Sequence, residues 1–339
     1  MSIRTSPQDP RPGRRRASRP HGSPLLGSQV VALGGGHGLA ASLAALRHLT
    51  EHLVAVVTVA DDGGSSGRLR RELGVLPPGD LRMALAALCD DGEWGRTWRD
   101  VMQHRFASEG GLDQHAVGNL LIVALWELLD DPVAGLDWVG RLLGARGRVL
   151  PMSLSALHIE ADVDFGGGRT AVVRGQAEVA TTTGRVTAVR LEPTDPVACP
   201  EAVESVRRAD WVVLGPGSWY TSVIPHLLVP ELADALVTTS ARRCLVLNLA
   251  SPSGETAGMS DAAHLDALHA HSPKLRIEVV VADPGSVDDL AALEAACGRL
   301  GGRLVLRQVS RGHHSAHHDP LRLAAALRDV LDSNWGDVV

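Results

Sequence analysis

The chain has 339 residues, of which 45% are hydrophobic and 21% are charged, and its formal net charge is −6 at pH 7. Such a chain is long enough for a large core, and no apolar run approaches the ~20 residues that a membrane-spanning helix needs. The first residues lack the apolar stretch of a secretory signal, so we expect a cytoplasmic protein without a membrane span.

Charge is unevenly distributed along the chain. Residues 1–28 contain six Arg and one Asp, whereas the remainder is acidic. A Pro-, Arg- and Ser-rich segment cannot bury enough apolar surface to fold, so the sequence predicts a disordered tail over residues 1–28. One folded domain is predicted over residues 29–335. Because that domain is acidic and has no basic stripe, specific nucleic-acid binding is disfavoured.

The domain opens with alternating strand and helix patterns. Residues 29–33 and 53–59 are typical of buried strands, with a helix over residues 38–49 between them. A Pro-Pro-Gly turn then precedes a helix over residues 81–88, for which Asp80 is the expected N-cap. Residues further on, from 93 to 143, are helical in character and are interrupted at Asp131-Pro132.

The second half predicts a parallel sheet with an insert. Residues 148–192 contain short alternating runs separated by glycines, which indicate a small antiparallel β insert. The alternation of strands and helices then resumes, with strands expected over residues 211–214, 244–249, 276–282 and 303–309. Strands separated by helices imply right-handed crossovers. The predicted fold class is therefore α/β, a Rossmann-like three-layer parallel sheet with a small antiparallel β insert.

Polar loops follow the predicted strands, and in parallel sheets ligands bind beyond the carboxyl ends of the strands. The first loop consists of Gly34, Gly35, Gly36, His37 and Gly38, and it opens a helix. Glycines let backbone N–H groups approach a phosphate closely, and a helix N-terminus favours an anion. A tight strand–helix turn without a ligand is the alternative interpretation.

The second loop begins with Asp61 and Asp62 and continues with small residues that include Ser65. An Asp after the second strand accepts hydrogen bonds from ribose hydroxyls in dinucleotide-binding folds. Alternatively, Asp61 and Asp62 hold a divalent cation such as Mg²⁺ that bridges phosphates. Both interpretations place this loop in a ligand site. Arg82, one turn into the helix that follows, is also placed to face a ligand.

Further polar residues converge on the same edge. Asn119 is a polar residue within an apolar helix, and Asn248 ends a predicted strand. The loop that follows residues 211–214 suits a second anionic group, through Gly215, Gly217, Ser218, Tyr220, Thr221 and Ser222. Histidines between residues 313 and 318 match metal ligands in composition, although a polar loop near the ligand is the preferred interpretation. No nucleophile–base signature is present, so the catalytic residues are unknown.

Taken in order, these motifs resemble the YvcK-like gluconeogenesis factors, which share a fold with CofD-type 2-phospho-L-lactate transferases. The resemblance extends over about residues 29–332. It is carried by GGGHGL, TVADDGGSSGRLR, LPPGDLR, VGNLL, GRVLP, GPGSWYTSVIPHLLV and HHDP. The chain departs from the usual family pattern at His37, Trp219 and His317, and it lacks the usual aromatic–Thr pair after GET.

The resemblance implies a cytoplasmic, non-enzymatic protein that binds UDP-N-acetylglucosamine and regulates carbon flux into peptidoglycan precursors. Such a protein is needed for cell shape during gluconeogenic growth. It implies a regulatory protein partner in cell-wall precursor synthesis, and we expect a homo-oligomer. The two glycine-containing loops would form the site together with Asp61, Asp62, Ser65 and Asn119. Two alternatives stay open: a CofD-type phospholactyl transferase that uses a nucleotide-activated donor and a metal, and an NAD-type dinucleotide-binding protein.

Overall fold

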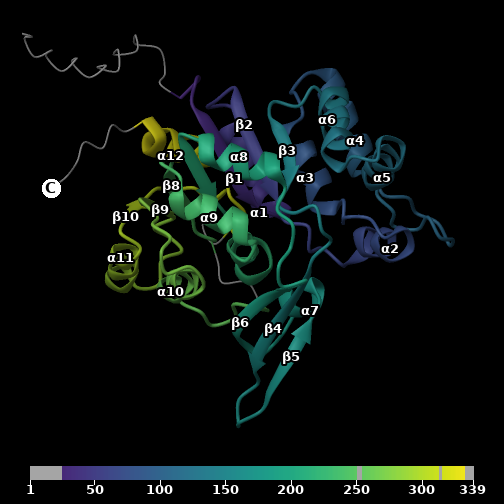
Figure 1. Ribbon diagram of the computed structural model, residues 1–339. Helices are drawn as coiled ribbons and strands as arrows, with labels where there is room; N and C mark the ends of the chain where they lie inside the picture. Colours follow the sequence, from purple (N-terminus) through teal and green to yellow (C-terminus); the bar gives the residue numbers. More distant parts are fainter. Residues whose placement is uncertain (1–24, 250–253, 313–314, 333–339) are drawn as a thin grey trace, which may run out of the picture.

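The computed structural model describes residues 25–249, 254–312 and 315–332 (Figure 1). Most of the predicted disordered tail, residues 1–24, therefore lies outside the described residues, as do His313 and His314. Leu25 is buried, and the Thr50 hydroxyl donates to the Ser28 carbonyl at 2.6 Å. The folded part thus includes residues 25–28, which the sequence had assigned to the tail. No helix in the described part is long and apolar enough to cross a membrane.

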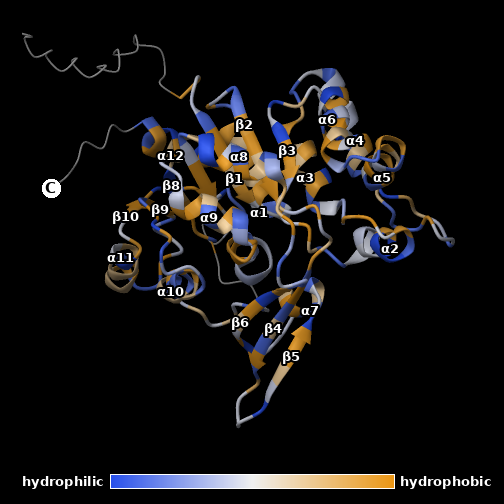
Figure 2. Ribbon diagram, in the orientation of Figure 1, coloured by the Kyte–Doolittle hydropathy of each residue, from blue (hydrophilic) through white to orange (hydrophobic). Residues whose placement is uncertain are grey.

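A seven-stranded parallel sheet forms the centre of the molecule, in the order β10-β9-β8-β7-β1-β2-β3. The strands are β1 (Gln29–Gly34), β2 (His52–Val57), β3 (Arg148–Pro151), β7 (Trp211–Leu214), β8 (Arg242–Val246), β9 (Val279–Ala282) and β10 (Arg303–Leu306). Every pairing is parallel. Their residues are almost continuously apolar (Figure 2), as expected for strands covered on both faces. The predicted fold class is confirmed.

Helices cover both faces of the sheet. The main helices of the described part are α1 (Gly36–Leu46), α2 (Gly64–Leu73), α3 (Gly79–Leu88), α4 (Glu93–Gln103), α5 (Val117–Leu129), α6 (Pro132–Leu143), α8 (Pro200–Arg208), α9 (Pro230–Thr238), α10 (Asp261–His271), α11 (Leu290–Arg299) and α12 (Pro320–Asp332). Helices α4 and α5 pack on α3 and α6 rather than on the sheet. Helix α1 packs against α3 and α12, and α8 packs against α9. Figure 1 shows α8 and α9 in front of the sheet and α1 and α3 behind it.

The antiparallel insert consists of β4 (His158–Asp164), β5 (Thr170–Arg174) and β6 (Arg185–Glu192), with the short helix α7 (Gln176–Ala180). It projects from one end of the molecule (Figure 1). Residues 148–151 form β3, which pairs with β2 in the main sheet. This pairing moves the start of the insert from residue 148 to the residues that follow β3.

Two local predictions are corrected and one is confirmed. The loop that follows Asp62 becomes helical at Gly64, because small residues allow a close turn: a Cβ on Gly67 would overlap the Asp62 carbonyl. Asp80 is not an N-cap, since α3 begins at Gly79 and its N-cap is Pro78. The predicted break at Asp131 is confirmed by the Asp131 carboxylate, which accepts from two backbone N–H groups at the start of α6.

Asp62 connects the insert to the body of the molecule. Its Oδ2 accepts from the backbone N–H of Gln176 at 2.9 Å, and its Oδ1 accepts from that of Ala177 at 3.1 Å. These are the first N–H groups of α7, which have no partner within the helix itself. A carboxylate 114 residues away in sequence therefore caps α7.

We predict that Asp62→Ala lowers the free energy of unfolding by roughly 1–2 kcal/mol, because two N–H groups at the start of α7 lose their charged acceptor. Urea unfolding measures the change. The control is Asp100→Ala, which removes a carboxylate that is 81% exposed and should change stability by less than about 0.5 kcal/mol. Equal losses in the two variants would contradict the capping role of Asp62.

Candidate functional site

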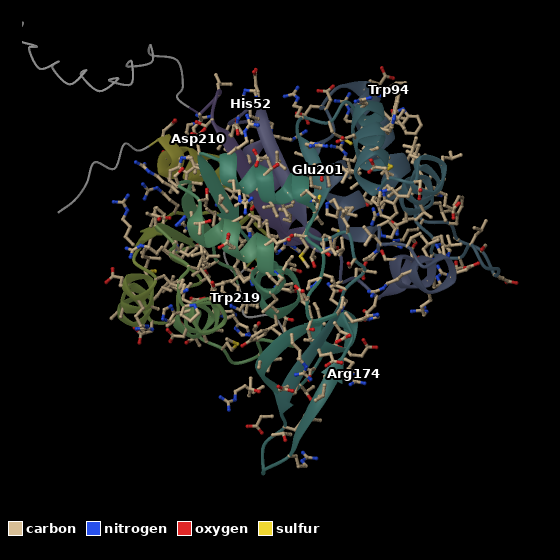
Figure 3. The ribbon with its side chains drawn as sticks, in the orientation of Figure 1. His52, Trp94, Arg174, Glu201, Asp210 and Trp219 are labelled. Carbon is tan, nitrogen blue, oxygen red and sulfur yellow. The ribbon has the colours of Figure 1, made fainter. Side chains whose placement is uncertain are left out.

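The candidate site is centred between β1 and β7, where the direction in which the chain adds strands to the sheet reverses. From β1 the chain moves to β2 and then to β3, whereas from β7 it moves the opposite way to β8. Neighbouring strands β1 and β7 therefore send their following loops to opposite faces, which leaves a crevice at their carboxyl ends. Trp219, in the segment after β7, lies toward the opposite end of the molecule from His52 at the amino end of β2 (Figure 3).

The two loops at this point are in direct contact. A Cβ on Gly38 would overlap the Pro216 carbonyl and lie 2.6 Å from the Cα of Gly217. The Ser42 hydroxyl, from the next turn of α1, donates to the Gly215 carbonyl at 2.7 Å. Only a residue without a side chain fits at position 38, so the predicted glycine loops form two sides of one structure.

A cavity of about 610 Å³ opens between these loops and the start of α12, and we call it the switch-point pocket. Among the predicted site residues, it is lined by His37, Gly38, Gly217, Ser218 and Asn248. Arg311, His317 and His318 also line it.

Asn248 fixes the backbone of this pocket. Its Oδ1 accepts from the Gly217 N–H and its Nδ2 donates to the Gly217 carbonyl, both at 2.9 Å. Both polar ends of the amide are thus used to hold one glycine in place. The role of Asn248 visible in the structure is to position the Gly217 backbone.

A smaller cavity of about 230 Å³, the acidic pocket, lies on the other side of the glycine turn. It brings together the predicted residues Asp61, Ser65 and Asn119 with Asp80 and Arg82. A hydrogen-bond chain lines it: Arg82 Nε donates to Asn119 Oδ1 at 2.9 Å, and Asn119 Nδ2 donates to Ser65 Oγ at 3.0 Å. Ser65 and Asn119 therefore have partners within the protein.

Burial dominates the electrostatics of the acidic pocket. The pKa of Asp80 is raised from 3.8 to about 7, mainly by burial and also by the nearby Asp61, while the Gly36 N–H and Arg82 oppose the change. Burial also raises the pKa of Asp61. Asp80 receives the Gly36 N–H at the start of α1, and in the described part of the chain its Oδ2 has no hydrogen-bond partner.

The two carboxylates of the predicted metal pair have different surroundings. Asp62 caps α7. Asp61 lines the acidic pocket together with Asp80, and the charge of Asp62 still acts on it. Within residues 25–249, 254–312 and 315–332 there is no group of three His, Cys, Asp or Glu side chains placed to hold a metal ion.

The remaining predicted residues lie in the buried segment that follows the loop after β7. Residues Trp219–Val223 form a single π-helical turn, and Tyr220, Thr221 and Ser222 are all buried in it. The Tyr220 N–H donates to Glu255 Oε1 at 3.0 Å. A Cβ on Gly35 would lie 3.3 Å from Ser222 Oγ, so Ser222 is close to the glycine turn.

Sequence reasoning did not find Asp80 or Glu255 as site residues. Asp80 was interpreted as a helix cap, although its position just after Pro-Pro-Gly, at the edge of the sheet, was a usable signal. Glu255 follows a loop of small residues and lies beneath the π-helical turn, where burial raises its pKa to about 7. Only the tertiary contact with Tyr220 reveals its role.

The sheet order and the crevice define a doubly wound α/β protein of CofD-like fold. Residues 30–299 match the family of the 2-phospho-L-lactate transferase CofD. A crystal structure of a UPF0052 family member from Bacillus halodurans superposes with a TM-score of 0.79 and 31% sequence identity, covering 88% of this chain and 98% of that one.

Relatives with similar sequences identify the family within this fold. A Mycobacterium tuberculosis protein, which carries the name gluconeogenesis factor provisionally, is 53% identical over 316 residues, 91% of either chain. The gluconeogenesis factor of Listeria monocytogenes is 39% identical over 250 residues, 74% of this chain and 76% of the relative. The chain belongs to the gluconeogenesis factor family, with a CofD-like domain.

We predict that Gly38→Ala separates the two glycine loops and lowers the free energy of unfolding by roughly 1–3 kcal/mol, because the new methyl group meets backbone atoms that cannot rotate away. Denaturant unfolding measures the loss. Gly298→Ala, in the last turn of α11 with open space around it, is the matched control and should be neutral or slightly stabilising. A neutral Gly38→Ala would show that the loops are not tightly apposed.

A second prediction concerns Asp80. Between pH 4 and 7 Asp80 is protonated in the folded chain but ionised in the unfolded chain. The free energy of unfolding therefore falls as the pH rises through this range. Asp80→Asn keeps an acceptor for the Gly36 N–H but cannot ionise. From pH 4.5 to pH 8 the variant should lose less stability than the wild type, by roughly 1–4 kcal/mol. Urea titrations at the two pH values test this, and parallel pH dependences would refute it.

Proposed function

We propose that this protein is a cytoplasmic regulator that binds a nucleotide sugar, with UDP-N-acetylglucosamine as the favoured ligand, and adjusts carbon flux into cell-wall precursors. The observation that carries the proposal is the switch-point pocket. Two glycine loops and the start of α1 meet there at the carboxyl edge of the sheet. Its volume of about 610 Å³ is within the range of small-molecule sites.

The pocket offers the groups that a nucleotide diphosphate requires. Glycines at the start of α1 and after β7 expose backbone to a phosphate, and the positive end of the α1 dipole favours it. Arg311 supplies a cation at the rim, and His317 and Ser218 supply polar contacts for the sugar or the base. Asn248 would act by holding Gly217, so the loop is ordered before the ligand arrives.

A binding role without catalysis is favoured by the state of the Ser65–His115 pair beside the acidic pocket. Ser65 Oγ lies 3.0 Å from His115 Nδ1, the separation of a nucleophile and its base. However, the same oxygen accepts from Asn119 Nδ2, and it is approached by the Ala116 N–H at 3.4 Å. Ser65 Oγ therefore already has hydrogen-bond partners within the protein, although Ser65 lines the acidic pocket.

The relatives' name supports a role in gluconeogenesis. The rest of the cellular role that we propose rests on the family resemblance. As a gluconeogenesis factor, the protein would be needed for cell shape during gluconeogenic growth. It would sense the nucleotide sugar as a homo-oligomer and transmit its occupancy to a regulatory protein partner in peptidoglycan precursor synthesis.

A second candidate function is phospholactyl transfer of the CofD type, and the pair Asp61 and Asp80 favours it. Two buried carboxyls with raised pKa values and an unpartnered Asp80 oxygen suit a divalent cation. A bound Mg²⁺ would supply charge neutralisation for the diphosphate of an activated donor. The NAD-type alternative is weaker, because Asp62, a candidate ribose acceptor, caps α7 instead.

Calorimetric titration of the full chain with UDP-N-acetylglucosamine, GDP, GTP and NAD, each with and without Mg²⁺, tests these functions. We expect UDP-N-acetylglucosamine to bind without Mg²⁺, and Asn248→Ala to weaken it by about tenfold or more because Gly217 loses both of its restraints. Thr187→Ala, a polar truncation on the insert, is the control and should bind like the wild type.

Two results would overturn the regulator. One is the absence of UDP-N-acetylglucosamine binding. The other is Mg²⁺-dependent binding of guanine nucleotides alone, accompanied by phospholactyl transfer to a deazaflavin. The second result would establish the transferase.

A further inference from the structure

A third cavity lies between α1, α3 and α4, with a volume of about 480 Å³, and we call it the arginine pocket. Its polar wall consists of His37, Arg82, Arg99, Gln103 and Arg105. Its apolar wall consists of Ala40, Met83, Ala86 and Ala87. None of the described residues that line it is acidic, although the chain as a whole has a net charge of −6. Three arginines therefore line one cavity, and no carboxylate is among its described lining residues.

Arg82 is the most constrained of the three arginines. Its side chain is buried, with the residue 4% exposed, and its Nε donates to Asn119. In the part of the chain that the structure describes, Arg82 Nη1 is also buried and has no hydrogen-bond acceptor. A buried donor of a charged group that lacks a partner is costly, and proteins keep such groups where a ligand completes them. Arg82 therefore brings an incompletely hydrogen-bonded cation to the wall of the arginine pocket.

The other two arginines, Arg99 and Arg105, add positive charge that nearby carboxylates neutralise only weakly. Among the described residues, Arg99 forms an ion pair with its sequence neighbour Asp100, at 3.9 Å. Arg105 is exposed and donates to the neutral Gln114 carbonyl at 2.8 Å. Burial and the like charge of Arg105 lower the pKa of Arg82 to about 10. An anion between these side chains would remove that repulsion.

The adjoining acidic pocket offsets only part of this charge. Arg82 and Arg105 line both cavities, so Asp61 and Asp80 attract Arg82 from the other side. Burial raises the pKa values of both carboxyls, which favours their neutral forms and weakens the attraction. Arg99 lines the arginine pocket at a position away from these acids.

We propose that the arginine pocket is a second ligand site, which binds the phosphate or carboxylate group of a small anionic molecule with an apolar part. The anion would accept hydrogen bonds from the three guanidinium groups, whose planar donors match such oxygens. The apolar part would lie on Ala40, Met83, Ala86 and Ala87. This site is distinct from the switch-point pocket, which it adjoins through His37, and it does not depend on the nucleotide sugar.

The test is a titration of the full chain with phenyl phosphate and, separately, with inorganic phosphate at constant ionic strength. Phenyl phosphate should bind more tightly, because its ring covers the apolar wall. Arg99→Ala and Arg105→Ala should each weaken phenyl phosphate binding by about tenfold, since each removes a charge-assisted hydrogen bond. Both side chains are partly exposed, so the fold should be kept. The charge-matched control Arg207→Ala, on α8, should bind like the wild type.

Comparison with the nucleotide sugar separates this proposal from the proposed function. Arg99→Ala should leave the affinity for UDP-N-acetylglucosamine unchanged, and Asn248→Ala should leave the affinity for phenyl phosphate unchanged. The second site is overturned if phenyl phosphate fails to bind, or if it binds Arg99→Ala and Arg105→Ala as tightly as the wild type. Loss of phenyl phosphate binding in Asn248→Ala alone would also overturn it, because the anion would then occupy the switch-point pocket.

Discussion

The contact between two backbone loops at the centre of the sheet is the constraint on which the rest of the site depends. Gly38 at the start of α1 lies against Pro216 and Gly217 after β7, with no room for a side chain. This contact holds together the two halves of the sheet, whose connections run in opposite directions. It also places the amino end of α1 at two cavities, both lined by His37, and next to Asp80 of the acidic pocket. The position of α1 thus decides which groups can reach a ligand.

Ionisable groups are buried beside this contact. In the described part of the chain, some of their polar atoms lack hydrogen-bond partners, which lowers the free energy of unfolding. Asp80 takes the Gly36 N–H but keeps an oxygen without a described partner, and Arg82 keeps a nitrogen in the same condition. Each group alone would lower the stability of the folded chain. Natural chains retain such groups where function requires them, and strained or incompletely bonded sites gather where ligands bind. The two unpartnered atoms therefore point to the same region as the glycine contact.

The sequence predicted the sheet well because its signals are local. Continuous apolar strands such as residues 211–214, and the Asp131-Pro132 helix start, depend on neighbouring residues alone. The family resemblance, carried by short motifs, is confirmed by the comparisons. Asp62 shows where local reasoning fails. Its position after a strand is typical of a ribose acceptor, yet its partners are N–H groups 114 and 115 residues away. No pattern within the DDGGSSG motif indicates that contact.

The candidate site was predicted as one cleft, and the structure divides the predicted residues among different tasks. His37, Gly38, Gly217, Ser218 and Asn248 line the switch-point pocket, whereas Asp61, Ser65 and Asn119 line the acidic pocket. This division bears on function. A transferase needs donor phosphates, metal and acceptor to meet at one reacting atom. A regulator needs only an ordered pocket whose ligand occupancy is transmitted to another part of the protein. The hydroxyl of Ser65 is already hydrogen-bonded and the Gly217 backbone is held by Asn248, and both observations support the binding role that we propose.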